Sequence, residues 1–404
     1  MTHCIAAPLR HPLAFLAAAL VLASCVATPP PVERAPLTPS TRATYTPVSW
    51  SDLPGFATDR IVEAWPAFRV GCDALLAKSQ TESAWRKPCD ASFAVDAASE
   101  ADVRAFFAAH FSPYAVAADD GNRDGLVTGY YEPSLAGSRV RTAQFKVPLH
   151  GVPDDLLVVD LASLHPELAD RRVRARIEGR RVVPYWSRRD IESGAMRNAR
   201  VLAYVEDPLD AFFLQIQGSG RIVLADASVI RLGYADQNGH PYRAIANTLI
   251  ARGEMTLEQA SMQSIREWAR ANPATLADVL DTNPSYVFFR EVPPAERGTL
   301  HASIDGPIGS LGAPLLPRRT IAVDTRAVPL GTPVWIATTQ PSTRAPLQRL
   351  VMAQDTGGAI RGAVRADFFW GAGETAAAEA GRMRERGRLW ILWPTAAPLP
   401  SRAP

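Results

Sequence analysis

The sequence predicts a mainly β protein that also contains helices, and three regional patterns support this prediction. Between about residues 50 and 115, apolar side chains recur at helical spacing. From residue 126 onward, short β-prone segments are separated by turn residues. From about 300 to 395, further short strands alternate with Gly and Pro turns, which is typical of a small closed or nearly closed β-barrel.

The composition is that of an ordinary globular chain with room for two or three domains. The 404 residues are 47% hydrophobic and 21% charged, and the formal net charge is +2. No basic tract is present, so nucleic acid is not expected as a partner. The 7 histidines show no metal-ligand spacing, and no phosphate-binding glycine loop occurs, so we expect no metal and no cofactor.

The N-terminal segment predicts export and a lipid anchor. Arg10 precedes an apolar run over 13–22 that is too short to span a bilayer. Residues 22–25, Leu-Ala-Ser-Cys, resemble the bacterial lipobox. This resemblance implies that 1–24 is a lipoprotein signal peptide and that Cys25 is lipidated. Val26, where an Asp would favour the inner membrane, favours the outer membrane; the alternative is an ordinary secretory signal with a chance cysteine.

Residues 25–48 contain the lipidated cysteine and are rich in Pro, Thr and Ala, which predicts a flexible tether. Beyond it, Cys72 and Cys89 are a candidate disulfide, because an oxidising compartment favours such a bond. Two buried thiols are the alternative.

The predicted helices carry recognisable start and stop signals. Ser99 with Asp102 predicts a helix start, followed by an apolar face that includes Val103 and Phe107. A second helix, around 242–250, is stopped by Gly253. Two more follow: one opens with the capping-box pair Thr256 and Gln259, and one lies between Asn272-Pro273 and Asn283-Pro284.

Strands are predicted elsewhere by alternation and β-prone composition. The segment 126–131 is one, and 201–234 contains more. Within it, 212–217 alternates as a strand that turns at Gly218-Ser219-Gly220. Four C-terminal segments complete the set: 320–324, 333–336, 350–353 and 389–393.

Three aspartates accompany the C-terminal strands: Asp324, Asp355 and Asp367. Asp355 and Asp367 are twelve residues apart, beside glycines and aromatics. A carboxyl group among apolar neighbours has a raised pKa and can donate a proton near neutral pH. Alternatively, Asp324 and Asp355 simply hold turns. Asp355-Thr356-Gly357 also matches the aspartic-protease triplet, but the second copy that such an enzyme needs is missing from the sequence.

A second candidate surface is formed by residues 128–133, Thr-Gly-Tyr-Tyr-Glu-Pro. Adjacent tyrosines on a strand point to opposite faces, so one can be core while the other lines a groove. Aromatic rings suit sugar faces, and Gln215, Gln217 and Ser219 add neutral hydrogen-bonding groups. An ordinary strand and hairpin is the alternative.

Several motifs together resemble one family, the membrane-bound lytic murein transglycosylase A (MltA) family. They are the lipobox, 128–133, 217–220 (Gln-Gly-Ser-Gly), 238–243, 283–289 and the segment from Asp355 to Asp367. The C-terminal region resembles the family's 3D domain, named for three aspartates that match Asp324, Asp355 and Asp367.

The resemblance implies a double-psi β-barrel domain plus an inserted β-rich second domain, with a substrate groove between them. The implied boundaries are 49–131 for the N-terminal part of the barrel, 132–290 for the insert and 291–396 for the 3D domain that completes the barrel.

The resemblance also implies the reaction. The expected enzyme is a peptidoglycan lytic transglycosylase, which cleaves the β-1,4 bond between N-acetylmuramic acid (MurNAc) and N-acetylglucosamine (GlcNAc) and leaves 1,6-anhydro-MurNAc. Asp367 is implied as the catalytic acid, with Asp355 and Asp324 in support. The implied substrate-binding residues are Thr128, Gly129, Tyr130, Tyr131, Glu132, Gln217, Gly218, Ser219 and Gly220.

Two other functions remain open from the sequence: a peptidoglycan hydrolase that uses Asp355 with Asp367, and a non-catalytic glycan-binding lipoprotein. We expect a monomer on the periplasmic face of the outer membrane of a Gram-negative bacterium. Its expected partners are glycan strands, the membrane through its lipid anchor, and enzymes of cell-wall synthesis or hydrolysis.

Overall fold

The computed structural model describes residues 42–78, 83–161, 163–165, 173–197, 199–395 and 397–400. The expected signal peptide and Cys25 lie outside the described residues. Within the described part, no helix has the length and apolarity needed to cross a membrane.

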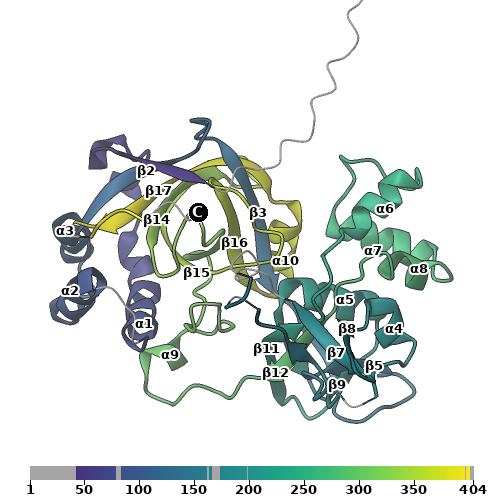
Figure 1. Cartoon of the computed structure of the whole chain (residues 1–404). Coiled ribbons are helices and arrows are strands. Elements are labelled where there is room, and N and C mark those ends of the chain that lie inside the picture. Colours follow the sequence, from purple (N-terminus) through teal and green to yellow (C-terminus); the bar gives the residue numbers. More distant parts are fainter. Residues whose placement is uncertain are drawn as a thin grey trace, which may run out of the picture. The chain divides into compact units, whose positions relative to one another are not determined.

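Six strands close into a barrel (Figure 1). Around the ring the order is β17-β14-β15-β13-β16-β3, and β3 pairs with β17 to close it. Their bounds are β3 Gly125–Glu132, β13 Thr320–Val323, β14 Pro333–Thr339, β15 Pro346–Asp355, β16 Arg365–Ala372 and β17 Arg384–Pro394. The pairs β13–β15 and β16–β3 are parallel, and the other pairs in the ring are antiparallel.

The four predicted C-terminal strands are therefore confirmed, but two elements between them were not predicted. One is β16, which carries Asp367 inside the strand rather than at its end. The other is helix α10 (Gly373–Arg382), which leads directly into β17. Helix α9 (Leu300–Ser303) precedes β13.

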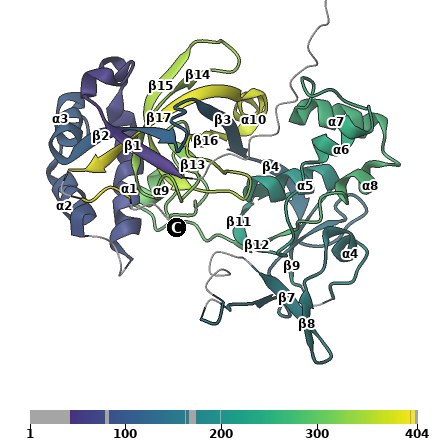
Figure 2. The same ribbon diagram turned by 45° about the horizontal axis from the view of Figure 1, so that its top comes forward.

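The first part of the predicted tether is not described, but its end is a strand. Residues 43–47, which we assigned to the tether, form β1 (Ala43–Pro47) and pair with β2 (Phe111–Ala118), which in turn extends the sheet from β17 (Figure 2). The alternating Thr44, Tyr45 and Thr46 suit a strand, whereas the high Pro and Ala content just before them masked this signal.

The region before β2 is helical, as predicted. It contains the short 3-10 helices η1 (Trp50–Asp52), η2 (Phe56–Thr58), η3 (Ile61–Ala64) and η4 (Ser92–Ala94), and the α-helices α1 (Trp65–Leu76), α2 (Ser83–Ala91) and α3 (Glu100–His110). Ser99 caps α3 by accepting a hydrogen bond from the Asp102 N–H. A disulfide joins Cys72 of α1 to Cys89 of α2.

These helices pack on the barrel through aromatic side chains. Phe68 and Phe107 meet edge-to-face at a centroid distance of 5.3 Å, and both are buried in the same core as Trp335 of β14. Helix α1 contacts β15, and α2 contacts β17.

The chain between β3 and β13 contains a second group of sheets. A six-stranded sheet has the order β12-β11-β10-β4-β9-β5, and a three-stranded sheet has the order β6-β7-β8. The bounds are β4 Ser134–Ser138, β5 Val147–His150, β6 Leu157–Val158, β7 Arg174–Glu178, β8 Arg181–Pro184, β9 Val201–Val205, β10 Ser219–Val223, β11 Val229–Gln237 and β12 Val287–Glu291. The helices are α4 Arg188–Glu192, α5 Pro208–Gln217, α6 Ile245–Ala251, α7 Met262–Ala271 and α8 Leu276–Leu280.

The strand predicted over 212–217 is wrong, because this segment lies in helix α5. Asp207 caps the helix by accepting from the Leu209 N–H at 2.7 Å, and Pro208 is its first residue. The helix ends at Gly218, whose φ of 77° suits only glycine without strain. Five consecutive residues, from Ala211 to Gln215, are buried, so the helical period is hidden and a strand-like alternation was inferred instead.

The capping-box hydrogen bonds predicted for Thr256 and Gln259 are confirmed, but the helix start predicted there is wrong. The two side-chain-to-backbone hydrogen bonds exist, at 3.0 and 3.3 Å, but they close a turn rather than open a helix. Helix α7 begins at Met262 and is capped by Ser261. Helices α6 and α8 lie where they were expected.

Candidate active site

Asp367 points away from the barrel core. Its neighbours in β16, Ala366 and Phe368, both belong to the main core, so Asp367 between them faces the other side of the sheet. It is in register with Ala322 of β13 on one side and with Thr128 of β3 on the other.

One oxygen of Asp367 is held by a short hydrogen-bond chain. The Thr128 hydroxyl donates to Oδ1 of Asp367 at 2.6 Å. The same hydroxyl oxygen accepts from Nη2 of Arg365 at 2.8 Å. Among the described residues, no hydrogen bond reaches Oδ2 of Asp367, so this oxygen is available to a substrate.

The surroundings of Asp367 favour its protonated form. Burial raises the pKa of Asp367, the nearby Asp355 raises it further, and Arg365 with Thr128 only partly opposes this. Because the net shift is upward, Asp367 keeps its proton at a higher pH than an ordinary aspartic acid does. This is the property that a general acid needs near neutral pH.

Asp355 is the last residue of β15 and is fully engaged in hydrogen bonds. Its Oδ1 accepts from the Ser310 N–H (3.0 Å), the Ser310 hydroxyl (2.7 Å) and the Thr356 N–H (2.9 Å). Its Oδ2 accepts from the Tyr130 hydroxyl at 3.2 Å. Burial raises the pKa of Asp355, and these hydrogen bonds oppose the shift.

Asp355 in β15 and Asp367 in β16 lie near each other because only one strand, β13, lies between their two strands. Ala322 is in register with both of them, so the two carboxylates flank one buried alanine. Tyr130, Phe369 and Ala322 belong to one small buried cluster on this face, whereas Tyr131 belongs to the barrel core. The two adjacent tyrosines therefore point to opposite faces, as predicted.

Asp324 does not join the other two aspartates. It is 1% exposed and pairs with Arg326 at 2.9 Å. Its Oδ2 also accepts from the Gly362 N–H at 2.9 Å. Burial alone would raise the pKa of Asp324, but the hydrogen bonds from Arg326 and from two backbone N–H groups outweigh it and lower the pKa. Asp324 thus holds the segment between Asp355 and Asp367 against the end of β13.

Several of the other expected site residues form the junction between β3 and the second group of sheets. The Tyr131 N–H donates to Oε1 of Gln217 at 3.1 Å. Glu132 is 1% exposed and binds Arg221 at 2.7 Å. Burial raises the pKa of Glu132, and its partner Arg221 opposes the shift.

The glycines of both motifs are needed for close packing. A Cβ on Gly129 would lie 2.7 Å from Nε1 of Trp370, and a Cβ on Gly220 would lie 2.3 Å from Leu214. Gly218 ends α5, and Ser219 begins β10. Of the nine residues expected to bind substrate, Thr128 donates a hydrogen bond to Asp367 and Tyr130 donates one to Asp355.

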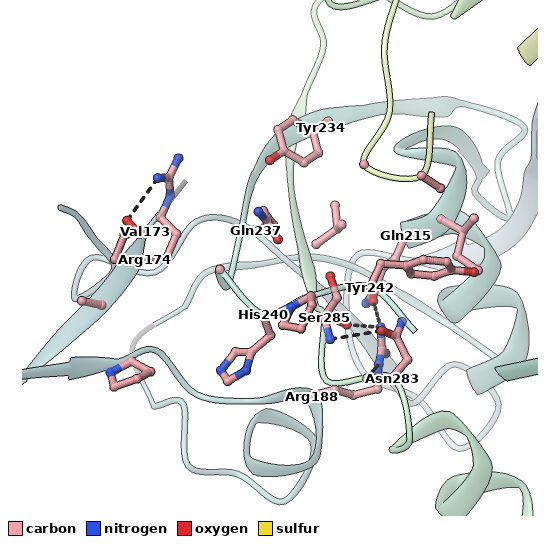
Figure 3. Close-up of a pocket in the computed structure, with 18 of the residues that line it drawn as sticks. Val173, Arg174, Arg188, Gln215, Tyr234, Gln237, His240, Tyr242, Asn283 and Ser285 are labelled. Atoms are coloured by element: carbon pink, nitrogen blue, oxygen red, sulfur yellow. Dashed lines mark hydrogen bonds between the residues drawn. The ribbon is translucent and has the colours of Figure 1, made fainter. Parts of the chain in front are cut away.

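A large cavity of about 920 Å³ lies next to the loop that follows Asp355 (Figure 3). Gly358, Ala359 and Arg361 of that loop contribute to its wall, although Asp355 and Asp367 themselves do not. The other polar and aromatic lining residues come from the second group of sheets, and they include Gln215, Tyr234, Gln237, His240, Tyr242, Asn283 and Ser285. These neutral polar and aromatic groups suit a polyol ligand.

Arg188, which is 2% exposed, holds several residues of the cavity wall together. Its guanidinium donates to the carbonyls of Ser285 (2.8 Å) and Asn283 (3.2 Å) and to the Gln215 side chain (Figure 3). Sequence reasoning noted Gln215 but not Tyr234 or Gln237. The resemblance over 238–243 was the available signal for this part of the wall.

No metal site is evident at either location. Within the described residues, no group of three or more His, Cys, Asp or Glu side chains is placed to hold a metal ion.

Two regions of the chain match the models of known domains. Residues 126–290 match the MltA specific insert domain, and 319–393 match the 3D domain. The solved structure of MltA from Neisseria gonorrhoeae is 36% identical and has a TM-score of 0.74, covering 91% of this chain and 96% of that one. The chain belongs to the MltA family.

Other family members are similar over different spans. The membrane-bound lytic murein transglycosylase A of Escherichia coli K12 is 32% identical over 272 residues, which is 66% of this chain but 64% of that relative. The structure of E. coli MltA with bound chitohexaose is 25% identical with a TM-score of 0.64, and it covers 89% of this chain and 95% of that one.

Proposed function

We propose that this MltA-family chain is a lytic transglycosylase of peptidoglycan. It cleaves the β-1,4 bond between MurNAc and GlcNAc and forms 1,6-anhydro-MurNAc during cell-wall turnover and remodelling. The observation that carries the proposal is a single carboxyl group, Asp367, with a raised pKa, one oxygen held by Thr128 and the other free. The related E. coli protein, named a lytic murein transglycosylase, supports the assignment.

The reaction needs one carboxyl group acting twice. Asp367 first gives its proton to the glycosidic oxygen, which leaves with GlcNAc. The resulting carboxylate then takes the proton from the C6 hydroxyl of MurNAc as O6 bonds to C1. Because the nucleophile belongs to the substrate, no water has to be positioned.

The hydrogen bonding of Asp355 favours this mechanism over a hydrolase with two carboxylates. A glycosidase needs its second carboxylate as a nucleophile or as a base for water. Asp355 accepts four hydrogen bonds, from Ser310, Thr356 and Tyr130, so its lone pairs are already engaged. Burial is the main cause of the raised pKa of Asp367, and Asp355 acts as a nearby charge that adds to it.

The glycan strand would lie in a groove between the barrel and the inserted domain, and we assign the barrel to the double-psi class. The six-stranded closed ring supports that assignment. The cavity of about 920 Å³ would hold sugar units next to the cleaved bond, since its wall includes the loop after Asp355. The chitohexaose bound to E. coli MltA supports a sugar ligand for this family.

We also propose that a lipid on Cys25 anchors the chain to the periplasmic face of the outer membrane. The lipobox supports this, as does the membrane-bound description of the E. coli relative. The chain would act there as a monomer on glycan strands, beside enzymes that build or cut the wall.

Mass spectrometry of the muropeptides released from purified sacculi tests the proposal. We expect products that end in anhydro-MurNAc, lighter by one water per cut than hydrolase products. Products that end in reducing MurNAc would assign the chain to the hydrolases instead.

A further inference from the structure

A second cavity, of about 370 Å³, is lined by arginines, and neither Asp355 nor Asp367 contributes to its wall. Its walls are formed by Glu63, Leu316, Pro317, Arg318, Arg319 and Arg349. Arg318 and Arg319 immediately precede β13, and Arg349 lies in β15, six residues before Asp355. At about 3.3 Å per residue, this puts Arg349 roughly 20 Å along the strand from Asp355.

The positive charge in this cavity exceeds its negative charge. Arg319 is 3% exposed and forms ion pairs with Asp59 at 2.8 Å and Glu63 at 2.8 Å. Arg318 and Arg349, in contrast, form no ion pair with any described residue. Two cations therefore face the cavity without a carboxylate of their own.

Two buried nitrogens at this site also lack hydrogen-bond acceptors. Nε of Arg319 and Nε of Arg349 are both buried and unpartnered within the described part of the chain. A buried donor without an acceptor is costly, so each such group calls for an explanation. Burial lowers the pKa of Arg349, and the nearby Arg319 and Arg318 lower it further, which reflects the same excess of positive charge.

The backbone at Arg318 is strained. Its φ is 61°, in the left-handed region that favours glycine. Its N–H donates to the Phe369 carbonyl at 2.7 Å, and its guanidinium carbon lies 5.4 Å from the centre of the Trp370 ring. Arg318 thus occupies a position where glycine would fit the backbone better. Backbone strain of this kind is commonly found at ligand-binding positions.

We propose that this cavity binds a phosphate group through Arg318 and Arg349. The planar guanidinium fork matches two phosphate oxygens at once, and two arginines without ion pairs favour an anionic group. The Nε atoms of Arg319 and Arg349 would donate to the same oxygens. The phosphate can come from free inorganic phosphate or from the headgroup of a phospholipid. This site is independent of the proposed glycan cleavage.

Isothermal titration of the full chain in detergent, with chloride as the background anion, tests the proposal. The two probes are inorganic phosphate and glycerophosphoglycerol, a soluble phosphodiester headgroup. We expect at least one probe to bind, and Arg349→Gln to weaken that binding about tenfold or more, as loss of a charged hydrogen bond does. The matched control is Arg252→Gln, which removes an equally charged, exposed arginine from the end of α6 and should bind like the wild type.

Arg318→Gly separates a binding role from a structural one. It removes the guanidinium but relieves the backbone strain, so phosphate binding should weaken while the thermal midpoint without phosphate stays the same or rises. Tighter binding of inorganic phosphate identifies the free ion as the ligand, and tighter binding of glycerophosphoglycerol identifies the headgroup. If the wild type binds neither probe, or if Arg349→Gln and Arg318→Gly bind as tightly as the wild type, the proposal is wrong.

Discussion

The Thr128 hydroxyl donates to Oδ1 of Asp367 at 2.6 Å, across a parallel strand pair whose members are 239 residues apart in sequence. Because the hydroxyl proton occupies Oδ1, the carboxylic acid proton of Asp367 is directed to Oδ2. Arg365 fixes this orientation, since it donates to the oxygen of the same hydroxyl.

Replacing Thr128 by Val, which keeps the shape but removes the hydroxyl, should reduce turnover about tenfold, the usual effect of losing a hydrogen bond to a charged group. The hydrogen bond from Thr128 lowers the pKa of Asp367, so its removal should raise that pKa. An acid catalyst loses activity as the pH rises through its pKa, so the alkaline limb of the pH–rate profile should move to higher pH. Thr128→Ser keeps the hydroxyl donor, so it should change neither the turnover nor the position of the alkaline limb. If the pH–rate profile of Thr128→Val is not shifted, the hydrogen bond from Thr128 does not tune the pKa of Asp367.

Replacing Asp355 by Asn should move the same limb in the opposite direction. The negative charge of Asp355 raises the pKa of Asp367, so a neutral amide should lower it and shift the alkaline limb to lower pH. Turnover should fall but not vanish. The pH–rate profile on purified sacculi measures this, and complete loss of activity with intact folding would instead favour the two-carboxylate hydrolase.

Replacing Asp367 by Asn should abolish the loss of turbidity of purified sacculi, with a decrease of about 10²-fold or more, as expected when a general acid is removed. Binding to sacculi in a co-sedimentation assay should remain, because the amide fills the same space. If this variant clears sacculi at the wild-type rate, Asp367 is not the acid, and if the wild type binds without clearing them, the chain is a binding module.

Replacing Asp324 by Asn should destabilise the fold by about 1–3 kcal/mol at pH 7, the cost of leaving buried donors poorly satisfied. The folded-state pKa of Asp324 is lowered, so its contribution is complete above the unfolded-state pKa of about 3.9 and is lost as the pH falls through the folded-state pKa. Urea denaturation at pH 7 and at a series of lower pH values should therefore show the difference shrinking below about pH 4. Asp119→Asn, at an exposed turn position, is the control and should change little.

The sequence was sufficient where a local signal decides the structure. Ser99 starts a helix because its hydroxyl meets the Asp102 N–H, and the segment 320–323 is a strand because it is short, apolar and β-branched. The same reasoning failed at 212–217, where burial on all sides removed the contrast between helical and strand periods. There, the Asp207-Pro208 start and the Gly218 stop were the better evidence.

The residues of the candidate site could be proposed from the sequence, but their spatial arrangement could not. Asp367 was found from its aromatic neighbours and from the family resemblance, yet Thr128 meets it only because β3 pairs with β16. No local pattern encodes a register between strands so far apart. For the same reason, the separation of Asp324 from the pair Asp355 and Asp367 became visible only in the fold.

The closure of the barrel by β3 has a consequence for biosynthesis. Both strands that pair with β3 in the ring, β16 and β17, come from the C-terminal part of the chain, so β3 has no strand partner in the barrel until β16 has been made. Pairings this distant in sequence form slowly. Asp367 therefore meets Thr128 only after β16 has been made, so the two residues come together late in folding although each lies in a strand of its own.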